Sequence, residues 1–366
     1  MYQSGHAISP IVEAVLRLDP SGSILTSNHL LLVKLALESR VYTPVLPVLD
    51  KFILYFPGVT NQPKPQYLSS MELPPMAYIT PAFNHTSKFK YQDVLEYFIY
   101  SGMIYMGLRR WQDALDCLEN AVTYPVKDGP PSKIMVEAYK KWVLVSLLLD
   151  GKPRSVPKST SSSAAKAYHV LAKPYEALAS IFETASAARL KAEVEAGSRI
   201  WNDDCNMGLM LNVLGEYQKF QIRNLGNVYS KISIPEVLQL TMSADTGAKS
   251  SSPAVVENLV QGMISDGTLH ATMSHPPTGP AVLTFSPKGP VLSEAQMQRE
   301  LVASTERIQT LSYEIKTTDR MLTHDKEYIK YAQKQKKNAK TQADQGIAVT
   351  DMDWNAEDEE LMAGVF

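Results

Sequence analysis

The hydrophobic pattern between Asn227 and Phe285 changes its period from that of a helix to that of a strand. A first helix is expected to begin at Ser233, because Ser233 and Glu236 have the spacing of a capping box. A second helix is expected to begin at Pro253, since proline is tolerated in the first turn. Its apolar residues recur at helical spacing and predict one buried face: Val255, Val256, Leu259, Val260, Met263 and Ile264.

After Asp266-Gly267 the apolar residues alternate with polar ones, which is the period of a half-buried strand. Ala271 and Met273 belong to this first strand, and Ala281–Phe285 forms a second one after a turn-rich stretch. Two helices followed by a hairpin predict a winged-helix unit. Such a unit is too small to bury a core alone, so we expect it to pack on the helices before it.

Composition limits the classes of protein that this chain can belong to. The 366 residues allow two or three domains, and a hydrophobic content of 45% supports a packed core. A net charge of −2 gives no overall field that would draw the chain to nucleic acid or anionic lipid. Two cysteines favour reduced thiols in the cytoplasm or nucleus. The apolar run from Trp142 to Leu149 is too short to span a bilayer, so no membrane association is expected.

Most of the chain before this unit has the pattern of helices. Between Tyr91 and Pro125, small and aromatic residues stand at the spacing of a tetratricopeptide helix pair: Gly102, Tyr105, Ala114, Leu118 and Ala121. Further helices are predicted at 8–18, 27–40, 132–149, 164–172, 175–185, 187–195 and 207–217. The predicted fold is mainly α, with a right-handed, tetratricopeptide-like helical-repeat array followed by a winged-helix subdomain and a long C-terminal helix.

The C-terminal part carries an apolar residue every seventh position: Leu301, Ile308, Ile315, Leu322 and Ile329. A second seam contains Met297 and Leu311 but is interrupted by Ser304, Thr318 and Asp325. This half-apolar pattern favours a bundle of unlike helices over a homodimeric zipper. A basic block at 326–340 and an acidic block at 344–360 follow, and such blocks are typical of solvated, flexible segments.

Several motifs resemble one known family. Ser101-Gly102-Met103-Ile104-Tyr105, Glu137–Lys141, Asn206–Leu209 and the stretch Val260–Ala271 are similar to the third subunit of the COP-nine signalosome. The shared domain type is the PCI domain, which also occurs in the proteasome lid and in a translation-initiation factor. A lid or initiation-factor paralogue is therefore the near alternative.

The resemblance implies a scaffold protein without catalytic activity of its own. Its partners would be other PCI and metalloprotease-type subunits of one complex that removes a ubiquitin-like modifier from cullins, and indirectly the cullin-RING ligases. The location would be cytoplasm and nucleus. The expected domains are helical repeats at 1–145, a PCI domain at 146–290 (helical part 146–226, winged helix 227–290), a bundle helix at 291–340 and an acidic flexible tail at 341–366.

Enzyme chemistry finds no support in the residue patterns. Metal hydrolysis needs converging ligands, and the seven histidines include no His-x-His or His-x-x-x-His pair. Cys117 lies among apolar neighbours on a predicted helix, where a packed thiol is expected. Asp203-Asp204 would cap the following helix rather than form an acid/base pair. We expect no catalytic residue, no metal and no cofactor.

DNA recognition is the main rival from another class, because winged helices often place their second helix in the major groove. The helix Pro253–Ser265 carries Glu257 and no Lys or Arg, which argues against binding to phosphates. We instead expect protein partners at two places. One is the strand Ala281–Phe285, predicted to be a sheet edge with candidate residues Ala281, Leu283, Thr284 and Phe285. The other is the C-terminal stripe, with candidate residues Leu301, Ile308, Leu311, Ile315, Leu322 and Ile329.

Overall fold

The computed structural model describes residues 4–56, 78–79, 81, 84–125, 130–184, 186–276, 279–286, 294–324, 328–330 and 333–334. It divides the chain into two compact units, Met1–Pro287 and Lys288–Phe366, each of which is described by itself. The sequence 286–290, rich in Pro and Gly, is expected to be a linker, and all of it except Ser286 lies outside the described residues. The acidic tail and most of the basic block lie outside them as well.

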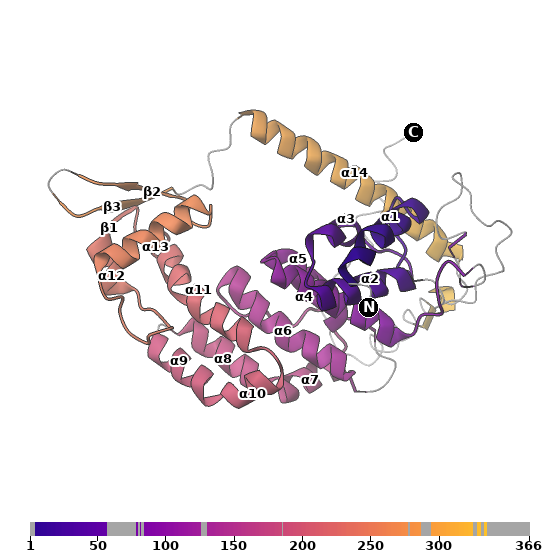
Figure 1. Ribbon diagram of the computed structural model, residues 1–366, viewed down its shortest axis with the longest axis horizontal. Helices are drawn as coiled ribbons and strands as arrows, with labels where there is room; N and C mark the ends of the chain where they lie inside the picture. The colour runs from indigo at the N-terminus through magenta and orange to yellow at the C-terminus, as the bar shows by residue number, and fades with distance from the viewer. Residues whose placement is uncertain are drawn as a thin grey trace, which may run out of the picture. The chain divides into compact units, whose positions relative to one another are not determined.

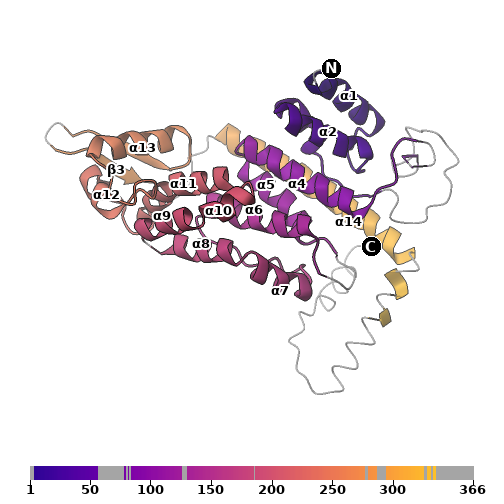
Figure 2. The same cartoon turned by 60° about the horizontal axis from the view of Figure 1, so that its bottom comes forward.

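The first unit is built from consecutive helices that lie side by side, up to a small sheet (Figures 1 and 2). The mainly helical fold class predicted from the sequence is confirmed. Short 3-10 turns occur at Ser4–Ala7 and Thr43–Val45. The helices are α1 (Ile8–Leu18), α2 (Ser27–Ser39), α3 (Leu46–Leu49), α4 (Tyr91–Gly107), α5 (Trp111–Val122), α6 (Lys133–Asp150), α7 (Ser162–Leu171), α8 (Lys173–Glu183), α9 (Ala187–Ala196), α10 (Ser198–Asp203) and α11 (Met207–Leu225).

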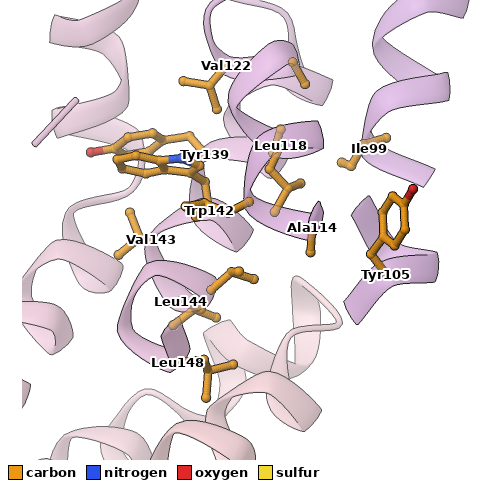
Figure 3. Close-up of a cluster of buried hydrophobic side chains, with 14 of the residues drawn as sticks. Ile99, Tyr105, Ala114, Leu118, Val122, Tyr139, Trp142, Val143, Leu144 and Leu148 are labelled. Carbon is orange, nitrogen blue, oxygen red and sulfur yellow. The ribbon is translucent and has the colours of Figure 1, made fainter. Parts of the chain in front are cut away.

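The predicted helix pair at 91–125 forms as α4 and α5. A Cβ atom added at Gly102 would lie 3.1 Å from Cγ of Leu118, so glycine is what allows the two helices to approach so closely. Ala114 and Leu118 are completely buried. Figure 3 shows Ala114 and Leu118 between Ile99 and Tyr105 of α4 and Trp142 and Leu144 of α6. The small residues thus have the packing role that their spacing predicts.

One hydrophobic core runs through the helical part, from Ile8 to Ala244. Because Leu144, Val145 and Leu147 are all buried in α6, the expected domain division after residue 145 falls inside a helix and inside this core.

The last part of the first unit has its own small core. It contains β1 (Lys231–Ser233), α12 (Ile234–Leu240), α13 (Pro253–Ser265), β2 (Ala271–Ser274) and β3 (Val282–Phe285). Together with Ile222 and Leu225 at the end of α11 these elements form a second hydrophobic cluster. We call residues 222–286 the winged-helix unit. Since α11 contributes to both cores, the unit packs on the preceding helices as expected.

The sheet of this unit corrects one prediction. It has three strands in the order β1-β3-β2, and both pairings are antiparallel. The expected edge strand Ala281–Phe285 is therefore the central strand. The strand that the sequence analysis missed, β1, pairs with β3 through Ile232 opposite Leu283.

The second unit is described mainly by one helix, α14 (Glu294–His324). A helix of 31 residues is roughly 46 Å long at 1.5 Å per residue. The predicted long C-terminal helix therefore forms over this range. The side chain of Leu322 lies outside the described set.

Candidate assembly surfaces

The backbone groups of β3 form hydrogen bonds with both neighbouring strands, β1 and β2. The amide of Phe285 donates to the carbonyl of Ser230 at 2.9 Å, and the amide of Ser286 donates to the carbonyl of His270 at 2.9 Å. In an antiparallel sheet the bonded side alternates along a strand, so odd-numbered residues of β3 bond to β1 and even-numbered ones to β2. The amide of Thr284 is thus directed at β2. No backbone group of β3 is left for a partner, and the predicted edge role of this strand is wrong.

The side chains of the four strand residues serve the core of the winged-helix unit. Leu283 and Phe285 are buried, while Ala281 and Thr284 are half-buried. The ring of Phe285 lies against the C-terminal end of α11, where a Cβ atom at Gly226 would come within 3.0 Å of Phe285 Cδ1. Phe285 therefore holds the sheet to α11, while the side chains of Ala281 and Thr284 stay partly exposed.

The true edges of the sheet are β1 and β2, and both are short. On β1, the outward amide of Ser233 donates to a carboxylate oxygen of Glu236 at 3.0 Å, as the capping box predicted. On β2, the amide of Ala271 donates to the carbonyl of Leu269. The alternation leaves Met273 with its amide and carbonyl directed away from β3. By the same alternation Lys231 of β1 directs its amide and carbonyl away from β3, so outward backbone groups lie at both edges, at Met273 of β2 and at Lys231 of β1.

The apolar stripe of α14 is exposed to solvent. Its two seams have exposed fractions of 51–63% at the residues whose side chains are described: Met297, Leu301, Ile308, Leu311 and Ile315. Ile329, which follows in the short stretch 328–330, is 40% exposed. Exposed apolar rows of this length are typical of helices that pack against other proteins. The interrupting Ser304 and Thr318 are exposed as well.

The second helix of the winged-helix unit presents no cation. Glu257 on α13 contacts Nε2 of His275 at 2.7 Å and so ties the hairpin to the helix. Because the face of α13 carries a carboxylate and no Lys or Arg, it lacks the charge that contacts with phosphates require.

A buried polar network that the sequence analysis missed joins α6, α8 and the turn between α10 and α11. Nζ of Lys140 lies 2.8 Å from both carboxylate oxygens of Asp204 and 2.7 Å from Glu137 Oε1. The hydroxyl of Tyr175 donates to Asp204 at 2.7 Å, and the amide of Asn206 donates to that hydroxyl.

The neighbouring Lys141 completes the network. Its Nζ donates to the side-chain oxygen of Asn206 at 2.8 Å, and burial lowers the pKa of Lys141. Asp204 does not cap α11, since the N-cap position is Asn206. The network instead fixes the start of α11, whose other end carries the winged-helix unit, so it positions the β2 edge indirectly.

Groups with catalytic potential are scattered over the described part of the chain. Among the residues that the structure describes, no three His, Cys, Asp or Glu side chains lie close enough together to hold a metal ion. Burial raises the pKa of the Cys117 thiol to about 12, which leaves it protonated and unreactive. Cys205 is exposed. None of the described helices combines the length and the apolar character that crossing a membrane requires.

These features define a class: a mainly helical-repeat protein that has a winged-helix unit and a long helix with an exposed apolar stripe.

Comparison with known proteins gives the family. Residues 2–164 match the family described as COP9 signalosome complex subunit 3, N-terminal helical repeats. The whole chain is 37% identical over 374 residues to the COP9 signalosome complex subunit 3 of Neurospora crassa, of which it covers 75%. It is 36% identical over 363 residues to the protein of that name from Emericella nidulans, with 97% of this chain and 72% of the relative aligned. The chain belongs to the COP9 signalosome subunit 3 family.

Proposed function

We propose that this protein is a non-catalytic scaffold subunit of a COP9 signalosome. Its PCI domain, expected at 146–290, would include the winged-helix unit, and other PCI and metalloprotease-type subunits would be its direct partners. The complex would remove a ubiquitin-like modifier from cullins and thereby regulate cullin-RING ligases, in cytoplasm and nucleus. A partner subunit would supply the metal and the hydrolytic chemistry, and this chain would hold that subunit in place.

The exposed stripe of α14 is the observation that carries the proposal. Burying a large apolar side chain contributes about 1.5–3 kcal/mol when it starts fully exposed. Five side chains that are more than half exposed are therefore a large driving force for association. By contrast, the free edge of β2 offers few hydrogen bonds, each worth about 0.5–1.5 kcal/mol net. We infer that burial of the α14 stripe supplies most of the free energy of association, and that the β2 edge fixes the alignment of a partner strand.

The second seam of α14, which is interrupted by polar residues, explains why the partners would be unlike helices. In a self-paired helix Ser304 would face its own copy across the interface, where a buried hydroxyl needs a hydrogen-bond partner. In a bundle of unlike helices Ser304 can lie at the solvated rim. A heteromeric bundle therefore buries the apolar stripe and leaves the polar position exposed, whereas a homodimer would bury both.

The test is co-expression with the other signalosome subunits, followed by pull-down. Ile308→Asp with Ile315→Asp places two charges in the stripe and should abolish incorporation. Ala303→Asp with Thr310→Asp is the matched control, because it adds the same charge at the same seven-residue spacing on the other face of α14. Incorporation of the stripe variant at the wild-type level would contradict the proposal. Recovery of proteasome subunits with the wild-type chain would instead indicate a scaffold subunit of the proteasome lid.

Catalysis is tested separately with the purified chain. We expect no cleavage of a cullin–modifier conjugate by the chain alone, with or without added zinc, and cleavage by the assembled complex. Robust turnover by the isolated chain would contradict the scaffold role.

A further inference from the structure

The stretch 151–175 is basic in a chain whose net charge is −2. It contains Lys152, Arg154, Lys158, Lys166 and Lys173 and not a single Asp or Glu. Arg154 forms an ion pair with Asp150, so its charge is compensated locally. The four lysines are exposed, and within the described part of the chain none of them forms an ion pair. This local positive charge is therefore available to a partner.

Helix α7 presents two residues of this stretch on its outer side, and a third follows at the start of α8. Tyr168 fixes the orientation of α7: its hydroxyl donates to the carbonyl of Val122 at 2.9 Å, and its ring stacks on Tyr139 at 4.6 Å. Lys166 and Val170 lie on the opposite, exposed face, and Lys173 follows at the junction with α8. Figure 2 shows α7 at the periphery of the first unit.

Two carboxylates on the neighbouring helices α6 and α8 already have hydrogen-bond partners. Glu176 accepts a hydrogen bond from the hydroxyl of Tyr139 at 2.7 Å and lies 2.8 Å from Nδ1 of His169. Glu137 is bound by Lys140. The lysines on the outer face of α7 therefore have no local counter-charge to displace.

Apolar surface lies between the charges. Val170 is 74% exposed and Leu171 is 55% exposed. A surface with lysines on both sides of exposed aliphatic side chains complements a segment in which an apolar residue stands between carboxylates. We call Lys166, Val170, Leu171 and Lys173 the α7 strip.

We propose that the α7 strip binds an acidic peptide segment that carries an aliphatic or aromatic residue between its carboxylates. Single-stranded nucleic acid is the other polyanion to consider, and its binding usually includes stacking of bases on exposed aromatic rings. Tyr168 and Tyr175 of this region are completely buried, and the exposed ring of His169 is held by Glu176, so residues 151–175 offer no free aromatic ring for stacking. The site uses no residue of α14 or of the β2 edge, and the proposal does not depend on assembly.

The experiment measures fluorescence anisotropy with the full chain and a labelled peptide, Glu-Asp-Glu-Leu-Phe-Glu-Asp-Glu. Wild-type protein should bind it and should not bind the neutral peptide Gln-Asn-Gln-Leu-Phe-Gln-Asn-Gln. Lys166→Glu with Lys173→Glu should weaken binding by about tenfold or more, because two attractions become repulsions at close range. Val170→Ser should weaken it by roughly threefold through lost apolar contact.

The matched control is Lys88→Glu with Lys249→Glu, which changes the net charge equally at two exposed lysines elsewhere. This variant should bind within about twofold of wild type, since screening confines charge effects to roughly 8 Å at physiological salt. Lys166→Ala with Lys173→Ala repeats the test if the glutamate variant unfolds. Equal losses in the strip and control variants, no binding of the acidic peptide, or tighter binding of a 12-nucleotide uridine RNA would each overturn the proposal.

Discussion

His29 should make the first unit less stable in mild acid. It lies in the first turn of α2 with 1% of its surface exposed. Its Nδ1 accepts the backbone amide of Thr26 at 3.2 Å and lies 2.8 Å from the Thr26 hydroxyl. A proton on Nδ1 would break this cap. Burial lowers the pKa of His29 to about 4, and the nearby charge of Asp19 opposes that effect only partly.

The sign follows from the two protonation states. Above the unfolded pKa of about 6.5 His29 is neutral in both states and contributes no pH dependence. As the pH falls below that value, the unfolded chain binds a proton that the folded chain does not, so the unfolding free energy decreases. With a folded pKa of about 4, the loss reaches about 2 kcal/mol at pH 5 and approaches about 3 kcal/mol below pH 4.

The assay is urea unfolding of wild type and His29→Gln at pH 7.5 and pH 5, followed by circular dichroism. Glutamine at this position can still reach back to the amide of Thr26, as in a capping box, but does not titrate. Other groups titrate equally in both proteins, so the difference between them isolates His29. Wild type should lose about 2 kcal/mol more than the variant between the two pH values. Equal losses would refute the argument that burial keeps His29 neutral.

Three further substitutions test a strained backbone position, the polar network around Asp204 and the central strand of the sheet. Cys205→Gly should raise the unfolding free energy by about 0.5–1 kcal/mol in urea, because Cys205 is held at φ 55° and only glycine adopts that conformation without strain; a destabilised variant would contradict this. Asp204→Ala should cost about 1–3 kcal/mol in the same assay, because Lys140 keeps only Glu137 and the hydroxyl of Tyr175 loses its acceptor; a cost under about 0.5 kcal/mol would mean that water replaces the carboxylate. Thr284→Pro should lower the melting temperature of the winged-helix unit, since it removes a ladder bond from the central strand; lost assembly with unchanged melting would restore the edge-strand interpretation.

Local signals in the sequence predicted most of the helical elements. The capping box at Ser233 and the proline at 253 mark the starts of α12 and α13, because helix caps depend on residues three or four positions apart. Gly102 likewise predicted a close helix contact, which Leu118 makes in the structure.

Long-range pairings could not be predicted in the same way. β1 has three residues, too few to show an alternation, and its partner β3 follows only after two helices and another strand. The role of Asp204 depends on Lys140, which lies 64 positions earlier in the chain. Without that contact, a helix cap was the natural interpretation of Asp203-Asp204. The same limitation placed the sheet edge on β3, although the outward backbone groups belong to β1 and β2.

The strand order also determines when the winged-helix unit can fold during synthesis. β1 leaves the ribosome first, but the strand that pairs with it is the last to be made, after α12, α13 and β2. Until Phe285 has emerged, both outer strands lack their common neighbour, and the apolar side chains of α13 have no sheet to cover. A nascent chain would therefore hold a completed helical-repeat core and an unfinished end at the same time. During this interval β1 and β2 have unpaired backbone groups on both sides, so pairing with another strand is avoided only once β3 has been inserted between them.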